Sequence, residues 1–477
     1  MLSGALPANA RLPATRVLAE ELGVARNTVV LAFDQLRAEG YLSSRRGGGT
    51  RVRSGIPDTL ISVHGDRART RGRERTPTDR TAPSRTPVRI PPRWARARIE
   101  LGGWGAGRDA AAVPFALGMP AIDAFPTALW SRLTARRWRS GNVFLGHAAA
   151  AGDLALRDAI AAYVTSARGA RCTAEHVIIV SGAQQALDLV ARVLTEPGQP
   201  VWLEDPGYVG ARAAFVAAGA RVIPVPVDDE GMNVAAGARA APRARLAYVT
   251  PSHQFPLGVI MSASRRLALL AWAHRVGAWV LEDDYDSEFR YSGRPIPCLQ
   301  GLDAERGSAS RVIYVGTFSK TLSPALRLGY LIVPESMVEI FRVARAVSGG
   351  HSPTIDQSVL ADFIGEGHYV RHVRRVRALC GERQQALLAA AERELSGALE
   401  LAPDAAGLHM VGWLPPRASD RAAAAAAQAQ GVDVTRLSRY SAVRPKRGAL
   451  LLGYAAFDER AIRAGVHALA RALSSQR

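Results

Sequence analysis

Lysine is nearly absent from this chain, and one of its two lysines lies where chemistry could occur. Lys and Arg together number 61, yet every basic residue other than Lys320 and Lys446 is arginine. A guanidinium stays protonated, whereas a lysine amine can lose its proton and attack a carbonyl to form an imine. Lys320 lies in GTFSKTLSPALRLGY, after the apolar run RVIYVG. This pattern predicts a nucleophilic lysine at the carboxyl end of a strand, and a solvated surface charge is the alternative.

The stretch VLEDDYDSEF places acids and a phenol directly after another apolar run. A buried Asp283 carboxylate beside a heteroaromatic nitrogen would keep that nitrogen protonated, and the Tyr285 phenol could bond a ring hydroxyl. Paired acids after a strand also occur in loops that only cap the next element. From this stretch alone both interpretations stay open.

Two further stretches could hold an anion. VSGAQQALDL changes from a strand-like to a helix-like pattern, and backbone N–H groups at a helix start form a seat for phosphate. The residues at this turn are Gly182, Ala183 and Gln184. Arg327, seven residues after Lys320, could neutralise the same phosphate with the help of the Thr317 and Ser319 hydroxyls. An ordinary strand–helix turn is the alternative for the first stretch.

An amine, an acid for a pyridinium, a phenol and an anion seat together describe a site for pyridoxal 5′-phosphate. The order of these parts resembles that of the fold type I aminotransferases, over roughly residues 113–477. The resemblance implies that Lys320 forms the Schiff base, that Asp283 lies at the pyridine nitrogen and that Tyr285 lies at O3′. The residues that it implies around the phosphate are Gly182, Ala183, Gln184, Thr317, Ser319 and Arg327.

Two more stretches resemble parts of the same family's site. Tyr208, in EDPGYVGAR, matches the aromatic residue that stacks on the cofactor ring. PSHQFPLG resembles the family's Asn-Pro-x-Gly turn, which implies that Gln254 or His253 replaces the asparagine near O3′. The sequence predicts no metal site.

Two positions depart from the family's pattern. Leu451, in ALLLGYAAF, occupies the place of the arginine that binds the substrate carboxylate on an RLSFA-like strand. Losing a bidentate carboxylate contact costs a few kcal/mol, so amino-acid turnover would weaken unless another arginine, such as Arg439, substitutes. His147, in GHAAAAG, stands where the family often has a tyrosine that reaches the neighbouring subunit's cofactor.

Alternating apolar runs and amphipathic stretches must position these groups. The predicted strands are HVIIV, PVWLED, ARVIPVPV, RLAYVT, AWVLEDD and RVIYVG. The predicted helices between them include QQALDLVARVL, GARAAFVAAG and SRRLALLAWAHRVG. This alternation predicts an open, largely parallel sheet covered on both faces. The tail from Val370 predicts mostly helix up to Glu400, then a small mixed α/β subdomain.

The segment before residue 54 divides into two short helices and a hairpin. The predicted apolar stripes are Val17, Leu18 and Leu22 on the first helix, and Val29, Val30, Phe33 and Leu36 on the second. Gly23 provides the turn, and YLSSRRGGGTRV predicts a two-stranded wing. Two such helices favour a helix-turn-helix, and an ordinary helical hairpin is the alternative. The candidate DNA contacts are Arg26, Asn27 and Thr28 at the start of the second helix, with Arg11, Arg16, Arg45 and Arg46 on phosphates.

RLPATRVLAEELGVARNTVVLAFDQLRAEGYL followed by GGGT is similar to the winged helix of the GntR regulators, which implies binding to double-stranded DNA. Those domains usually begin with another helix before the Leu-Pro dipeptide, which the printed chain does not include. We therefore expect either a misassigned start or a winged helix without its first helix.

The overall composition is that of a soluble globular protein, with 48% hydrophobic and 22% charged residues. The formal net charge of +19 favours a polyanionic partner. No apolar run is long enough to span a membrane and no signal peptide is evident, which predicts a cytoplasmic protein. Three widely spaced cysteines favour reduced, buried thiols over disulfides. Residues 55–100 are rich in Arg, Pro and Thr and predict a flexible, basic linker.

The joined architecture resembles the MocR-type regulators of the GntR family. We expect an α/β protein with a winged helix-turn-helix over residues 1–54 and the linker over residues 55–100. Residues 101–477 would form an aminotransferase-like domain, with a mainly parallel sheet between helices and a small C-terminal α/β subdomain. The resemblance implies a transcription regulator, a homodimer, that senses an amine or amino acid, or pyridoxal phosphate itself, through an imine at Lys320. An aminotransferase with a vestigial DNA-binding arm is the alternative.

Overall fold

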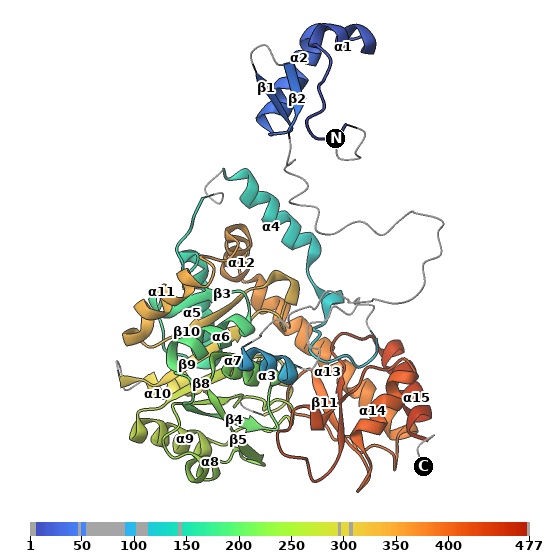
Figure 1. Cartoon of the computed structure of the whole chain (residues 1–477). Coiled ribbons are helices and arrows are strands. Elements are labelled where there is room, and N and C mark those ends of the chain that lie inside the picture. The colour runs from blue at the N-terminus through green and yellow to red at the C-terminus, as the bar shows by residue number, and fades with distance from the viewer. Residues whose placement is uncertain are drawn as a thin grey trace, which may run out of the picture. The chain divides into compact units, whose positions relative to one another are not determined.

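The computed structural model describes two compact units, Met1–Pro87 and Val88–Arg477 (Figure 1). The residues whose structure is described are 6–45, 49–53, 91–101, 113–141, 146–293, 297–304 and 309–474. Among the described residues, no helix is both long and apolar enough to cross a membrane.

The first unit is a helix-turn-helix followed by a hairpin, as predicted. Its elements are α1 (Thr15–Leu22), α2 (Arg26–Ala38), β1 (Leu42–Arg45) and β2 (Gly49–Val52). Gly23 ends α1 in the left-handed region with a φ of 65°. The two strands pair antiparallel, with Leu42 opposite Val52. The small core consists of Ala19, Val29, Phe33, Leu42 and Val52.

The predicted apolar stripe on α1 is wrong in part. Val17 and Leu22 are 46% and 62% exposed, whereas Ala19 is buried and Leu18 is half-buried against it. In α1 a small residue faces α2, because the two short helices approach closely at Ala19. The stripe on α2 is confirmed, since Val29 and Phe33 are buried in the core.

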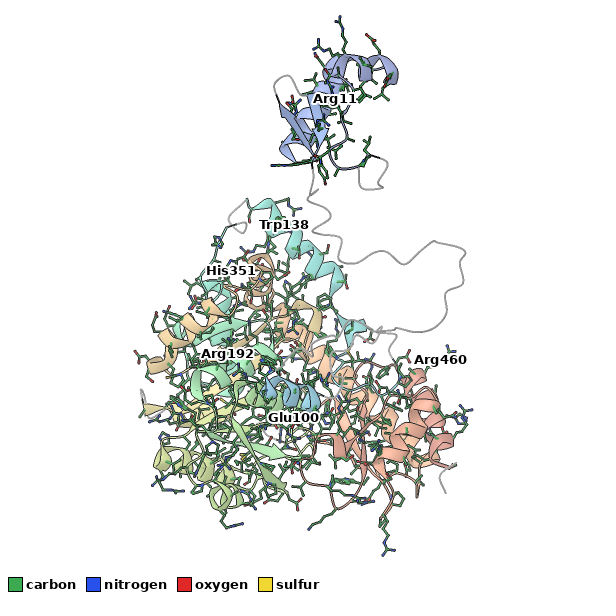
Figure 2. The ribbon with its side chains drawn as sticks, in the orientation of Figure 1. Arg11, Glu100, Trp138, Arg192, His351 and Arg460 are labelled. Carbon is green, nitrogen blue, oxygen red and sulfur yellow. The ribbon has the colours of Figure 1, made fainter. Side chains whose placement is uncertain are left out.

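The second unit begins with a helix, although the composition of this region predicts a flexible linker. This helix, α3 (Pro92–Leu101), packs along α7 (Val209–Ala218). Arg212 of α7 donates from Nη1 to Glu100 at 3.4 Å, and Arg439 donates from Nη2 to the Leu101 carbonyl at 3.0 Å. Figure 2 shows Glu100 on this helix. Residues 55–90 of the predicted linker lie outside the described residues.

In the described part of this unit, eight strands form one mixed, mostly parallel sheet in the order β3-β10-β9-β8-β7-β4-β5-β6. Their bounds are β3 Val177–Val180, β4 Pro200–Asp205, β5 Arg221–Asp228, β6 Gly231–Met232, β7 Leu246–Val249, β8 Trp279–Asp284, β9 Val312–Thr317 and β10 Gly329–Ile332. The six predicted strands are all present. The sequence did not predict β6, or β10, which runs antiparallel to both β3 and β9.

Helices cover both faces of this sheet, as the alternation predicts (Figure 1). Along β3, Ile178 and Val180 pack in one apolar cluster, while Val177 and Ile179 pack in another on the opposite face. The covering helices are α5 (Leu154–Arg168), α6 (Ala183–Leu194), α7, α8 (Val234–Ala240), α9 (Ala263–Val276), α10 (Leu299–Asp303), α11 (Val338–Val347) and α12 (Thr354–Gly365), and α4 (Thr127–Arg139) packs on α12.

The C-terminal part forms a small α/β subdomain, also as predicted. The long helix α13 (His368–Glu394) leads into an antiparallel sheet of order β11-β13-β12. The strands are β11 (His409–Trp413), β12 (Thr435–Arg436) and β13 (Ala449–Gly453), and the remaining helices are α14 (Asp420–Ala429) and α15 (Glu459–Ser474). One apolar cluster joins α13, α14 and α15 to this sheet.

Candidate functional site

The predicted chemical groups lie where strands of the large sheet end. The strand β8 ends at Asp283 and Asp284, and β9 ends at Thr317. The antiparallel strand β10 lies between β3 and β9, so its first residue, Gly329, pairs with both Val180 and Thr317. A Cβ on Gly329 would lie 3.1 Å from the Gly182 Cα atom. This close packing brings the turn after β3 beside the loop that carries Lys320.

The anion seat is built from two unusual backbone conformations. Gly182 caps the N-terminus of α6 with a φ of 92°, which favours glycine. Arg327 adopts a left-handed φ of 52°, and its Nη2 donates to the Ser181 carbonyl at 2.6 Å. A Cβ on Gly182 would lie 3.6 Å from the Arg327 guanidinium. The free N–H groups of the helix and a guanidinium therefore converge on one turn, an arrangement that suits a phosphate.

The other residues predicted at the phosphate lie close to this turn in the sheet. The Ser319 N–H donates to Thr317 Oγ1 at 3.2 Å, which fixes the start of the lysine loop. The Gln184 side chain points toward α7 instead, because its Nε2 donates to the Gly210 carbonyl at 3.0 Å. Gln184 Oε1 also lies 3.5 Å from the Tyr208 hydroxyl, so these two predicted residues are neighbours. Ala183 is the first residue of α6.

Lys320 has the surroundings of a nucleophilic amine. Its Nζ donates to the Gly118 carbonyl at 2.7 Å, and a Cβ on Gly118 would lie 3.3 Å from that nitrogen. Burial lowers the pKa of Lys320, and the nearby carboxylates Asp286 and Asp283 oppose that shift. A lowered pKa increases the fraction of free amine that can attack a carbonyl.

Asp283 is a buried acid with one oxygen to spare. Its Oδ2 accepts from the Tyr248 hydroxyl at 2.8 Å, whereas its Oδ1 is buried without a partner among the described residues. Burial raises the pKa of Asp283 to about 7. A buried acceptor without a donor is unfavourable, and a protonated ring nitrogen would satisfy it. The residues at this site therefore fit a pyridinium ring with an aldehyde and a phosphate.

Asp284 points to the opposite face of β8 and has a structural role. Its Oδ2 accepts from Arg168 Nε at 2.6 Å and from the Tyr314 hydroxyl at 2.6 Å. Successive side chains alternate across a strand, so the two adjacent acids meet different environments. The two acids therefore differ in their partners among the described residues, because Asp284 is ion-paired with Arg168 whereas Asp283 accepts only from the Tyr248 hydroxyl.

Tyr285 lies against His253, one of the two residues predicted to replace the family's asparagine. The Tyr285 hydroxyl is 3.0 Å from His253 Nδ1, and burial raises the pKa of Tyr285, so the phenol keeps its proton. The amide of Gln254 is used elsewhere, because its Nε2 donates to the Pro206 carbonyl at 2.9 Å and the Phe255 carbonyl at 2.7 Å. The Phe255 ring, not predicted, packs edge-on against both Tyr208 and Tyr285.

The candidate DNA contacts lie on the surface of the first unit. Arg26, Asn27 and Thr28 form the exposed first turn of α2. Arg16 is exposed on α1. The backbone of Arg11 forms an isolated antiparallel β-bridge with that of Arg51 in the wing. Arg46 lies outside the described residues. The exposed first turn of the second helix is the part that enters the major groove in helix-turn-helix proteins.

Comparison with known families and proteins agrees with both units. Residues 1–52 match the bacterial regulatory proteins of the gntR family, and residues 134–469 match the aminotransferases of class I and II. The probable rhizopine catabolism regulatory protein MocR of Rhizobium meliloti is 40% identical over 485 residues, covering 98% of this chain and 90% of that protein. The pyridoxine biosynthesis regulator PdxR of Corynebacterium glutamicum is 32% identical, covering 95% and 88%.

The chain belongs to the MocR-type regulators of the GntR family. The predictions of family and fold class are therefore confirmed. Among solved structures, the α-aminoadipate aminotransferase LysN of Thermus thermophilus, complexed with N-(5′-phosphopyridoxyl)-L-leucine, has a TM-score of 0.71 and 31% identity. The alignment covers 80% of this chain and 98% of LysN. The prediction that the second domain is of the pyridoxal-phosphate-dependent type is confirmed at the level of the family.

Leu451, predicted to stand in place of the family's carboxylate-binding arginine, lies in an apolar environment in this MocR-type chain. Leu451 is fully buried in a cluster with Val209, Leu437 and Tyr440, against which Leu117 packs. Arg439, the predicted substitute, donates to the Leu101 carbonyl of α3. His147 packs edge-on against His351, with ring centroids 6.3 Å apart.

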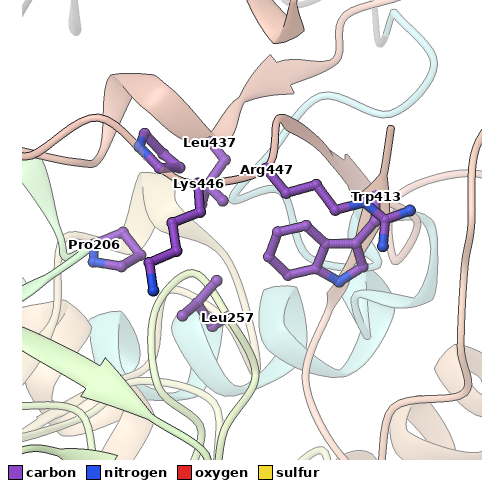
Figure 3. A pocket seen from close by; sticks show the side chains of 7 residues that line it. Pro206, Leu257, Trp413, Leu437, Lys446 and Arg447 are labelled. Carbon is purple, nitrogen blue, oxygen red and sulfur yellow. The ribbon is translucent and has the colours of Figure 1, made fainter. Parts of the chain in front are cut away.

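A separate cavity of 410 Å³ contains the second lysine (Figure 3). It is lined by Pro206, Leu257, Trp413, Leu437, Pro445, Lys446 and Arg447. The Arg447 guanidinium lies 5.9 Å from the Trp413 ring centre and is paired with Glu400. None of these residues belongs to the predicted cofactor site, so the cavity is a separate feature.

The sequence did not identify three residues that contact the site. Tyr248 bonds Asp283, while Asp286 and Asp404 bond His253. Tyr248 lies inside a buried strand that is apolar elsewhere, and a polar group in such a run is a usable signal. Asp404 lies more than 100 residues away in the C-terminal subdomain, so only the folded structure brings it there.

Proposed function

We propose that this chain is a DNA-binding transcription regulator that holds pyridoxal 5′-phosphate at Lys320 and senses an amine through it. The observation that carries this proposal is the unpaired, buried Oδ1 of Asp283 in the same site as Lys320 and the Gly182 turn. Beside a candidate anchor lysine and an anion seat, this buried acceptor suits the protonated nitrogen of a cofactor ring. The winged helix-turn-helix in the same chain supports DNA as the target.

Each residue of the site would have one task. Lys320 would anchor the cofactor, and Asp283 would keep the ring nitrogen protonated. Tyr285 would donate to the ring oxygen, and Tyr208 would cover the ring face. The phosphate would lie at the α6 N-terminus, near Gly182, Ala183, Gln184, Thr317, Ser319 and Arg327. When bound, pyridoxal phosphate supplies a carbonyl for amines and an electron-withdrawing ring.

The cofactor would serve sensing because the aminotransferase-like unit is joined to a DNA-binding unit. An amine that exchanges with Lys320 would release that side chain, and the two states of the site would favour different arrangements of the C-terminal subdomain. We propose a cytoplasmic homodimer that recognises two half-sites, because this chain carries one winged helix and two copies would present two. Arg439 is our candidate for the carboxylate of an amino-acid effector.

The decisive experiment measures DNA binding by fluorescence anisotropy, using the DNA upstream of the protein's own gene. Arg26→Ala should weaken binding roughly tenfold or more, because it removes a contact on the exposed first turn of α2. Arg192→Ala, an exposed arginine on α6, is the matched control and should bind like the wild type. Equal binding by both variants would contradict the assignment of α2 as the DNA-reading helix.

A second measurement tests the cofactor. After loading with pyridoxal phosphate and removal of the unbound cofactor, the purified protein should show a visible absorption band, and Lys320→Ala should lack it because the variant has no amine to hold the cofactor. Lys446→Ala, the only other lysine substitution the chain offers, should keep the band. A wild type without the band would overturn the proposal that Lys320 anchors the cofactor.

The alternative function is amino-group transfer. The intact set of Lys320, Asp283 and Tyr285 favours it, whereas the apolar surroundings of Leu451 do not. Sustained conversion of amino acids to keto acids by a protein that does not bind DNA would favour this alternative.

A further inference from the structure

His253 is fully buried and both of its ring nitrogens face acceptors. Nδ1 lies 2.9 Å from Asp286 Oδ2 and 3.0 Å from the Tyr285 hydroxyl. Nε2 lies 3.2 Å from Asp404 Oδ2. A carboxylate can only accept, so each nitrogen must carry a proton, and the ring must be an imidazolium. Two carboxylates around one buried ring provide the opposite charge that this state needs.

The imidazole is enclosed by elements from both parts of the second unit. Asp286 and Tyr285 follow β8, whereas Asp404 and His409 belong to the C-terminal subdomain. The His409 ring packs against His253 at 5.6 Å, and its Nε2 is bonded to the Pro256 carbonyl. The His253 ring fits only because Gly258 and Gly407 carry no side chain, and a Cβ on Gly258 would lie 3.2 Å from His253 Nε2. A Cβ on Gly407 would lie 2.1 Å from the His253 ring.

The segment that carries Asp404 is itself anchored. Asp404 Oδ1 accepts from the Ala406 N–H at 3.2 Å. The Tyr291 and Tyr454 hydroxyls both donate to the Gly407 carbonyl, at 2.6 Å and 2.7 Å. Asp404 is therefore held at a defined place in the subdomain, and a movement of the subdomain relative to β8 would change its distance to His253.

We propose that His253 is a positioning residue for Tyr285, and that Asp404 makes its action depend on the C-terminal subdomain. This inference rests on the proposed function, in which Tyr285 faces the cofactor's ring oxygen. The charged Nδ1–H is shared between Asp286 and the phenol oxygen, so it orients the phenol. Tyr285 also shares a side-chain hydrogen bond with Asp286, which therefore competes for the proton that the phenol would donate to the ring oxygen. A cationic donor also polarises the phenol and strengthens that donated bond.

The inference predicts a shared pH response. The pH at which the visible band of the cofactor-loaded protein changes should shift by about one unit in His253→Gln, because a neutral amide cannot polarise Tyr285. Asp404→Asn should shift it in the same direction and by less. In the Tyr285→Phe background, His253→Gln should add no further shift, because the group on which it acts is gone.

His409→Gln is the matched control, since His409 is equally buried in the same cluster but bonds the Pro256 carbonyl, not Tyr285. Its titration should match the wild type. An unshifted titration of both His253→Gln and Asp404→Asn, or a full shift by His253→Gln in the Tyr285→Phe background, would overturn the inference alone. Asp404→Asn keeps the test open if His253→Gln fails to fold. A wild type with no visible band would overturn the proposed function, and this inference with it.

Discussion

At the scale of residues, the environment decides what a side chain does. Asp283 and Asp284 are adjacent and identical, yet Asp284 pairs with the Arg168 guanidinium and the Tyr314 hydroxyl, while Asp283, within the described part of the chain, accepts only from the Tyr248 hydroxyl. Each acid has one buried oxygen without a partner among the described residues. The pairing of Asp284 fixes the end of β8. Burying the Asp283 Oδ1 atom without a hydrogen-bond donor costs free energy, and a bound cationic group that donates to it would remove that cost.

Asp283→Asn should stabilise the cofactor-free protein at neutral and higher pH. The pKa of Asp283 is raised to about 7, so its favourable contribution is present below the unfolded pKa of about 4 and is lost as the pH rises through 7. An asparagine stays neutral, so the variant should gain roughly 1–3 kcal/mol in urea unfolding at pH 8 and little at pH 4. With pyridoxal phosphate present, the same variant should retain the cofactor less well.

Asp284→Asn is the contrasting variant. It leaves the buried Arg168 guanidinium without its carboxylate, which typically costs about 3–5 kcal/mol. It should therefore be destabilised at pH 8, where Asp283→Asn is stabilised. Destabilisation of both variants at pH 8 would mean that Asp283 already has a partner for its second oxygen.

At the scale of elements, the site depends on how β10 enters the sheet. This short antiparallel strand lies between β3 and β9 and places the turn that carries Arg327 against the Gly182 turn. The Arg327 backbone is left-handed, which is uncommon for a residue other than glycine, asparagine or aspartate. The position of the guanidinium is thus set by a strained turn and by its bond to the Ser181 carbonyl.

Gly182→Ala should weaken phosphate binding. An alanine at a φ of 92° is strained by roughly 1–3 kcal/mol, and its Cβ would occupy the space in front of Arg327. We expect a loss of cofactor affinity of about tenfold or more, measured by titrating pyridoxal phosphate and following its absorbance. Gly277→Ala, at the end of α9 with a φ of 70° and open space around it, is the control. The Gly277→Ala variant should lose stability through a similar backbone strain but keep the wild-type affinity for pyridoxal phosphate.

Six of the strands, and the functional groups that follow them, could be predicted from the sequence. Buried strands are continuous apolar runs, and the acids, the lysine and the glycine turn come directly after such runs. β10 could not, since GYLI is too short to show a pattern or a direction. The exposed Val17 and Leu22 were misplaced because periodicity identifies an apolar face without showing which neighbour covers it. Likewise, the choice of His253 over Gln254 at Tyr285 depends on rotamers that local sequence does not specify.

At the scale of the whole molecule, the second unit begins earlier in the chain than composition predicts. Arg- and Pro-rich residues predict a linker up to residue 100, but α3 already belongs to the second unit and packs along α7. An exposed, Arg-rich helix can be stable in this way, because contacts at a few positions, such as Ala97 and Glu100, attach it. The composition of a segment indicates whether it is polar, but it does not show whether the segment packs against a neighbouring domain.

Two fragments test this boundary. A fragment of residues 88–477 should fold and show the cofactor band, but it should not bind DNA because it lacks the winged helix. A fragment of residues 102–477 should be less stable by about 1–3 kcal/mol in urea, because it loses α3 with its bonds from Arg212 and Arg439. Equal stability of the two fragments would show that α3 contributes nothing to the second unit.

The scarcity of lysine has a practical consequence for labelling. Amine-reactive reagents can modify only two side chains in this chain, Lys320 and Lys446. Lys446 is exposed at the rim of the cavity in Figure 3, whereas Lys320 would be shielded by a covalently bound cofactor. Intact-mass spectrometry after acylation would then show which fraction of the protein molecules holds the cofactor at Lys320. Among side chains, a fluorophore attached under these conditions would mark Lys446 alone, beside Trp413.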